Sequence, residues 1–143
     1  MATGTTFSAD IRQLVAKYKD RMADVVKQSV QEFGDRVLIG TPADTGAARN
    51  YWWSSVDNSK TTHPSPPTKG QRGVKGSAGG APAISPADIA AAPGHIYQLR
   101  NGAAYIRKLE YGSSAQAPAG FVRIAIADFP NIVAKAARDV GAR

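Results

Sequence analysis

The chain has 143 residues, a length that fits one domain, and we expect a single domain over residues 1–143. Apolar residues make up 43% and charged residues 20%, which excludes a fully disordered chain. The absence of cysteine excludes disulfides, thiolate metal sites and thiol nucleophiles, and no apolar run reaches the roughly 20 residues of a membrane span. The N-terminus lacks the basic start and apolar stretch of a signal peptide, so we expect a protein kept in a cytoplasm-like compartment.

The formal net charge is +7, and most of the excess lies in the middle and the C-terminal half of the chain. The segment 58–95 carries Lys60, Lys69, Arg72 and Lys75 against Asp88 alone. Such a distribution favours a polyanion passing nearby.

Residues 7–38 are predicted to form one long helix. Ser8 is its expected N-cap, and Gly40, Thr41 and Pro42 are expected to end it. At about 1.5 Å per residue the helix spans roughly 45 Å, which is long for so small a domain. One apolar stripe recurs along it at steps of three and four, through Phe7, Ile11, Leu14, Val15, Tyr18, Met22, Val25, Val26, Val30, Phe33 and Val37.

Residues 48–57 are predicted to form a strand, in which the adjacent Trp52 and Trp53 point to opposite faces. One indole can enter the core, and the other must meet a helix, a neighbouring subunit or solvent. Residues 58–93 are predicted to be an extended loop, because they hold six of the nine prolines. A loop this long is usually functional or disordered, and this one is long enough to reach a neighbouring molecule.

The rest of the chain predicts a strand over 94–100, a short helix over 103–111 and a helix over 120–140 that Pro130 kinks or splits. The fold class is therefore α+β, with a long N-terminal and a C-terminal helix packed on a small antiparallel sheet and a long irregular loop. Two strands alone are marginal, so we expect the sheet to be completed by the loop or by a neighbour. This pattern favours an assembling protein over a self-contained enzyme.

No catalytic, cofactor or metal constellation is found. The triplet Asp44, Thr45 and Gly46 occurs in aspartic proteases, but there it follows an apolar strand, whereas here we expect a turn. The segment 69–73 resembles a phosphate loop only in composition, and neither histidine has a second ligand at i+3 or i+4. Glu110 is expected to be structural and to pair with Arg107.

Two stretches together resemble a known family. Residues 41–53, with Asp44, Thr45, Gly46, Trp52 and Trp53, are similar to the "T-P-x-D-T-G, basic residue, W" signature of tail-completion proteins of tailed bacteriophages, also called neck or head–tail joining proteins, including the minor tail protein Z type. The second stretch, 105–123, is similar to that family's "Y-x-x-x-L-E-Y-G … Q-A-P-x-G" segment. It contains Tyr105, Glu110, Tyr111, Gly112, Pro118 and Gly120.

The resemblance implies a non-enzymatic virion protein, assembled in the host cytoplasm, that completes the tail and joins it to the head connector or stopper. It implies a homo-oligomeric ring, commonly a hexamer, which also meets the tail terminator or tail tube and surrounds double-stranded DNA. It implies no cofactor and no membrane. If the ring surrounds DNA, we expect one of two sets of cations to face the channel: either Lys60, Lys69, Arg72 and Lys75, or the C-terminal set around Arg123, Lys135 and Arg138. The alternatives are a tail-terminator ring protein and a free basic nucleic-acid-binding protein.

Overall fold

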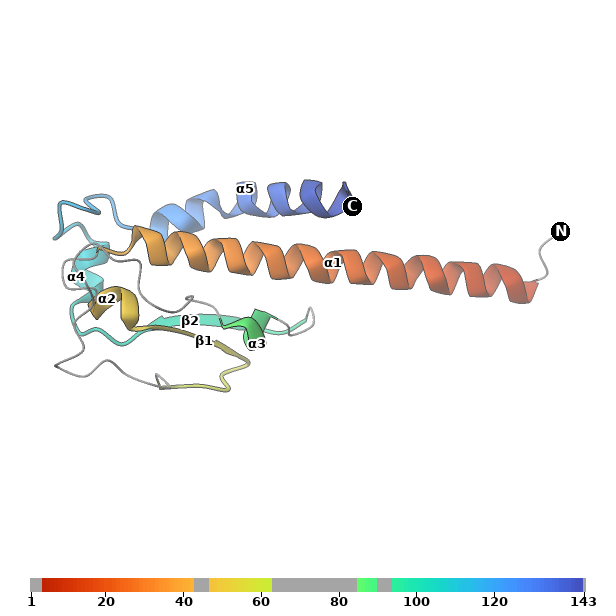
Figure 1. The fold of residues 1–143 in the computed structure, drawn as a ribbon, viewed down its shortest axis with the longest axis horizontal. Coiled ribbons are helices and arrows are strands. Elements are labelled where there is room, and N and C mark those ends of the chain that lie inside the picture. The colour runs from red at the N-terminus through yellow and green to blue at the C-terminus, as the bar shows by residue number, and fades with distance from the viewer. Residues whose placement is uncertain (1–3, 43–46, 63–84, 90–93, 143) are drawn as a thin grey trace.

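The computed structural model describes residues 4–42, 47–62, 85–89 and 94–142. It confirms the α+β class, with a long N-terminal helix, a C-terminal helix and a small antiparallel sheet (Figure 1). Most of the predicted loop lies outside the described residues, as do Asp44, Thr45 and Gly46. The elements are α1 (Gly4–Gly40), α2 (Ala47–Asn50), β1 (Trp52–Val56), α3 (Pro86–Ile89), β2 (Tyr97–Asn101), α4 (Ile106–Glu110) and α5 (Val122–Gly141).

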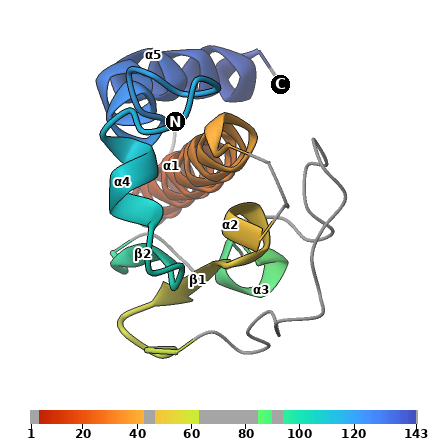
Figure 2. The same cartoon turned by 90° about the vertical axis from the view of Figure 1, so that its left-hand side faces the viewer.

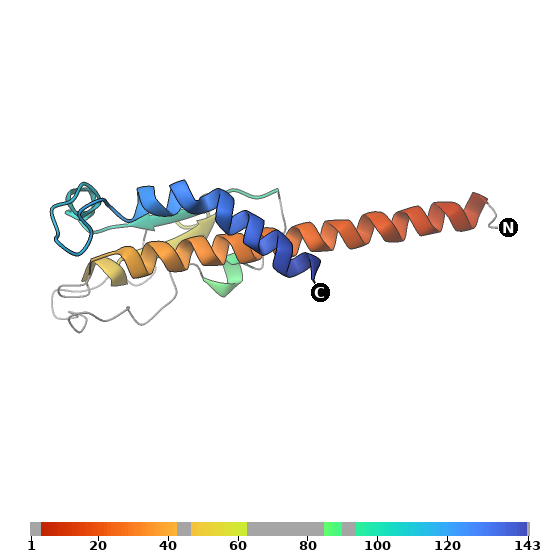
Figure 3. The ribbon, with the colours of Figure 1, turned by 90° about the horizontal axis from the view of Figure 1, so that it is seen from above.

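The C-terminal half of α1 is the middle of three layers. Figure 2 shows α5 on one side of α1 and the β1–β2 sheet on the other. α5 begins beside the C-terminal end of α1 and runs back along it in the opposite direction (Figure 1). Because α1 has 37 residues and α5 only 20, the N-terminal half of α1 projects beyond every other described element (Figure 3).

The sheet pairs β1 and β2 antiparallel, with Trp52 opposite Asn101 and Val56 opposite Tyr97. Both strands begin later than predicted, at residues 52 and 97 instead of 48 and 94. Residues 47–50 form a helical turn, α2, which allows the Arg49 side chain to reach back to the end of α1. Ahead of β2, Gly94 has a φ of 100°, so the chain is still turning there.

A second correction falls inside the predicted loop, where residues 86–89 form the short helix α3. Ser85 caps it, since its hydroxyl accepts the N–H of Asp88 at 3.2 Å, and Pro86 occupies the first helical position. The spacing of Ser85 and Asp88 is that of a capping box, a signal that the proline content of the segment hides. The prediction of uninterrupted loop over 58–93 was therefore wrong at this point.

The core is small and lies between α1, α5 and β1. Val37, Ala117, Phe121 and Ala125 form its buried centre. Further along, Phe33 of α1 meets Phe129 of α5 edge to face, with ring centroids 5.8 Å apart. α5 continues through Pro130 without ending, so the helix is not split. None of the helices in the described ranges is long and apolar enough to cross a membrane.

Candidate functional site

The first of the two motifs closes the C-terminal end of α1. The last carbonyls of a helix have no partner within it. Here the Arg49 guanidinium donates to the carbonyls of Thr41 at 2.6 Å and Ile39 at 2.9 Å. A cation at this end also suits the helix dipole. The Trp52 indole N–H donates to the Thr41 hydroxyl at 2.9 Å, which in turn donates to the Val37 carbonyl at 2.7 Å.

The second motif closes the N-terminal end of α5. The Glu110 carboxylate accepts three consecutive backbone N–H groups, from Phe121 at 3.0 Å, Val122 at 2.9 Å and Arg123 at 2.9 Å. It also accepts the Arg123 Nε–H at 3.0 Å, and Arg123 Nη2 donates to the Glu110 carbonyl at 2.8 Å. Glu110 is thus a helix cap supplied from eleven residues upstream. The prediction that Glu110 pairs with Arg107 was wrong, because its partner is Arg123.

Burial raises the pKa of Glu110, but hydrogen bonds from the Phe121, Arg123 and Val122 amides and from the Arg123 guanidinium outweigh it. The net effect lowers the pKa below the ordinary value of a glutamate. The Glu110 side chain is only 14% exposed, so the charged carboxylate is largely shielded from solvent. The Arg123 guanidinium also lies 4.8 Å from the centre of the Tyr111 ring, a cation–π contact.

Two glycines of the second motif are required by space as well as by conformation. Gly112 has a φ of 90° and Gly120 a φ of 89°. A Cβ at Gly112 would lie 2.5 Å from the Pro118 carbonyl oxygen, and one at Gly120 would lie 2.7 Å from the Glu110 carbonyl oxygen. The segment between Glu110 and α5 therefore folds tightly back on itself only with glycine at both places.

The two motifs meet at Phe121, which is 3% exposed. The Trp52 and Phe121 rings pack edge to face with centroids 6.4 Å apart. On the other side, a Cβ at Gly40 would lie 2.9 Å from the Phe121 Cβ, so α1 ends in direct contact with the start of α5. We call this combined arrangement, Thr41, Arg49 and Trp52 with Glu110 and Phe121–Arg123, the helix-end joint.

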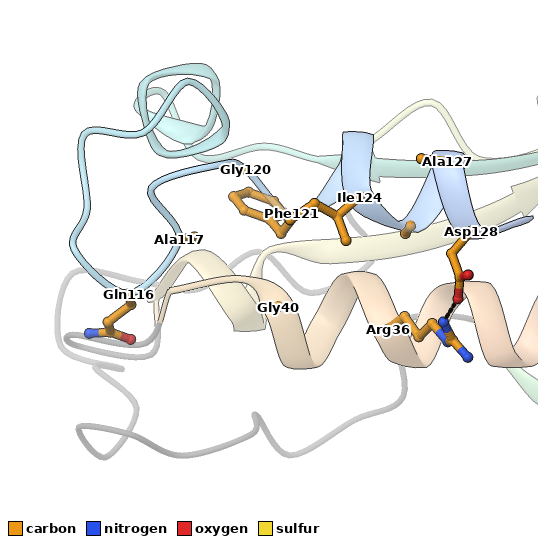
Figure 4. Close-up of a pocket in the computed structure, with 10 residues that line it drawn as sticks. Arg36, Gly40, Gln116, Ala117, Gly120, Phe121, Ile124, Ala127 and Asp128 are labelled. Atoms are coloured by element: carbon orange, nitrogen blue, oxygen red, sulfur yellow. Dashed lines mark ion pairs between the residues drawn. The ribbon is translucent and has the colours of Figure 1, made fainter.

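A surface hollow of about 580 Å³ lies beside the helix-end joint, between α1 and α5 (Figure 4). Its apolar wall includes Phe121 and Ile124, and its charged side chains, Arg36 and Asp128, form an ion pair with each other. Arg36 also bonds Glu32 at 3.0 Å. The hollow therefore presents apolar surface and an already neutralised ion pair.

The described cations of the predicted DNA-facing set have different environments. Lys60 pairs with Asp88 at 2.8 Å, and Arg123 pairs with Glu110. Lys135 and Arg138 lie exposed on α5, where the described residues give neither an ion pair. Lys69, Arg72 and Lys75 lie outside the described residues.

A polar cluster around Asp88 was not foreseen from the sequence. Its carboxylate, in a residue 8% exposed, accepts the Ser54 hydroxyl at 2.5 Å as well as Lys60. The Ser54 hydroxyl also accepts the Ser85 N–H at 2.8 Å, so the cluster fastens α3 to β1. Burial raises the pKa of Asp88, but the bonds from Lys60, Ser54 and Ser85 outweigh it and lower the pKa.

The other aromatic residues of the motifs are distributed over both faces of the sheet and over the surface. Trp52 packs against the core, while Trp53 covers the turn after β1 and donates its indole N–H to the Lys60 carbonyl at 3.3 Å. Tyr105 and Tyr111 are exposed. His95 pairs with Asp57 at 2.5 Å, and the described ranges hold no group of three or more His, Cys, Asp or Glu placed to bind a metal.

The N-terminal half of α1 carries an uncovered apolar stripe. Its six large side chains are each 45–63% exposed: Phe7, Ile11, Leu14, Val15, Tyr18 and Met22. An amphipathic helix normally buries such a face against a partner. Among the described residues, only the end of α5 comes near the stripe, beside Tyr18 and Met22, and the first turns of α1 project beyond every other described element (Figure 3).

Comparison with protein-family models, with curated proteins and with solved structures found no match to this chain.

Proposed function

We propose that the chain is a structural, non-enzymatic subunit of a tailed-phage virion that completes the tail and joins it to the head connector. In this role copies of the chain form a ring, with six copies as the expected number, around the DNA channel. The resemblance of residues 41–53 and 105–123 to the neck proteins supports the proposal. The contacts of the described motif residues also support it. Arg49, Trp52 and Glu110 form hydrogen bonds at the ends of α1 and α5, which is a structural role.

The uncovered stripe of α1 carries the proposal. Contiguous exposed apolar surface on a soluble protein marks an interaction site, and here it runs along half of the longest element. The core behind it is small, with four buried side chains at its centre. A subunit of this shape gains most of its missing apolar burial by assembling.

The cations of α5 support a DNA-facing role more than Arg123 of the helix-end joint does, because Arg123 is paired with Glu110. Lys135 and Arg138 are exposed and one helical turn apart, so they present two charges on the same side of α5. Two such cations favour weak, sequence-independent attraction to phosphates, which suits a duplex that must slide through a ring. The same two residues favour the alternative of a free basic nucleic-acid-binding protein, and a tail-terminator ring stays the closest structural alternative.

The experiment is to measure the mass of the purified protein alone and after mixing with tails assembled without this subunit. The expected result is a defined oligomer that co-sediments with tails and restores their joining to heads. Protein that leaves the tails unjoined and instead binds free duplex with sequence preference at physiological salt would contradict the proposal.

A further inference from the structure

The uncovered stripe of α1 is a continuation of the face that binds α5. Phe33 packs on Phe129 and Arg36 pairs with Asp128, which identifies the side of α1 that α5 covers. At about 100° per residue, Phe7, Ile11 and Tyr18 lie on that same side of the helix. α5 ends at Gly141, and the face continues without it.

An apolar groove marks the point where α5 stops. It has a volume of about 280 Å³ and lies between α1 and the last turn of α5. Val140 at its base is 4% exposed, whereas Met22 on its wall is 63% exposed. The groove is lined by Tyr18, Arg21, Met22, Val25, Val26, Ala137, Val140 and Gly141.

We propose that the first turns of α1 from a second copy of this chain, with Phe7 and Ile11, fill this groove. Fifteen residues of continuous helix separate Phe7 from Met22, which is roughly 22 Å, so Phe7 cannot reach the groove of its own chain. An apolar patch that fits a pocket elsewhere on the same molecule makes a contact between copies. The inference rests on the proposed function in that it names the contact by which the subunits meet.

Charge complements shape at this contact. Asp10 follows Phe7 by about one helical turn, and Arg21 stands at the wall of the groove. The described residues give neither side chain an ion pair within its own chain. An entering helix with Phe7 in the groove brings the Asp10 carboxylate toward the Arg21 guanidinium.

Disulfide cross-linking tests the contact directly, because the chain has no cysteine. The double variant Phe7→Cys/Ala137→Cys should form covalent species of two or more copies on mild oxidation. A bond within one chain is excluded, since the two Cα atoms of a disulfide lie within about 7 Å. The matched control is Ala9→Cys/Ala137→Cys, because position 9 is about 200° around the helix from position 7. Equal cross-linking in both variants, or none in the first, would overturn the inference.

Self-association of the full chain gives a second measurement. Phe7→Ser/Ile11→Ser should weaken it by at least about tenfold, while Ala9→Ser/Ala16→Ser on the opposite face should leave it unchanged. Since Phe7 and Ile11 are 63% and 45% exposed in the free chain, melting temperatures should change little. Wild-type protein that sediments as a monomer up to its solubility limit would overturn the inference.

The stoichiometry separates the inference from the proposed function. A closed ring lost in Phe7→Ser/Ile11→Ser supports both. A two-copy species lost in that variant supports the contact and counts against the ring. A ring that this variant leaves intact overturns the contact and leaves the ring function standing.

Discussion

Glu110 holds three successive backbone N–H groups and one guanidinium with a single carboxylate. Replacing it by alanine leaves the start of α5 without acceptors and Arg123 without its counter-charge. Glu110→Ala should therefore lower the free energy of unfolding by about 2 kcal/mol, at the upper end for loss of a helix cap. Urea denaturation measures this change. Asp24→Ala removes an exposed carboxylate that has no hydrogen bond or ion pair with another described residue, and it should change stability by less than about 0.5 kcal/mol.

The lowered pKa of Glu110 gives stability a pH dependence with a definite sign. Its pKa in the folded chain lies below the unfolded value of 4.5, so its contribution is present above that value and is lost as pH falls through the folded pKa. The melting temperature should fall between about pH 5 and pH 3, and fall less in Glu110→Gln, which cannot titrate. Asp57 and Asp88, whose pKa values are also lowered, provide the same background in both proteins. Parallel melting curves would contradict this assignment.

The sequence predicts that Glu110 is structural, but it predicts the wrong partner, Arg107, in place of Arg123. Arg107 is the near neighbour at i−3, and spacing rules favour it. Arg123 becomes the partner because the chain reverses between Gly112 and Gly120, where both residues have positive φ. That reversal depends on two glycines, 2 and 10 residues after Glu110, and the spacing rules for helical neighbours do not describe such a pattern.

At the scale of elements, α5 offers the clearest test of DNA attraction. Lys135→Gln/Arg138→Gln should weaken binding of random duplex and reduce the slope of log affinity against log salt by about 2, one for each lost phosphate contact. Arg107→Gln/Lys108→Gln on α4 is the matched control with the same charge change. If both variants reduce binding equally, the attraction comes from net charge alone and not from α5.

The long helices are predictable because their apolar periodicity extends over many turns, and both α1 and α5 lie within a few residues of their expected ranges. The short elements are not. α2 occupies positions predicted as strand, because Arg49 turns back to the carbonyls of α1, a tertiary contact. α3 depends on Ser85 capping and on the Asp88 cluster, and only the first of these has a local signal.

At the scale of the whole molecule, the two ends of α1 differ in how many tertiary contacts hold them. The C-terminal end is fixed by the helix-end joint, while the first turns of α1 project beyond every other described element, and α5 reaches α1 only from about Tyr18 onward. Local stability follows burial, so amides of residues 7–20 should exchange with solvent much faster than those of residues 29–38 in dilute protein. Hydrogen exchange followed by mass spectrometry measures this. In concentrated, assembled protein the N-terminal amides should become protected, and unchanged fast exchange would contradict burial of the stripe.

Because α1 is 17 residues longer than α5, the length of the projecting part of α1 sets the distance at which its apolar face can meet a neighbouring molecule. Its reach beyond α5 grows or shrinks by about 1.5 Å with every residue added or removed, and its apolar face rotates by about 100° at the same time. Removing seven residues shortens the reach by about 10 Å and returns the face to within about 20° of its first direction. Removing five turns the face about 140° away. Spacing between neighbouring molecules can therefore change only in steps of whole helical turns if the same apolar face is to meet its partner.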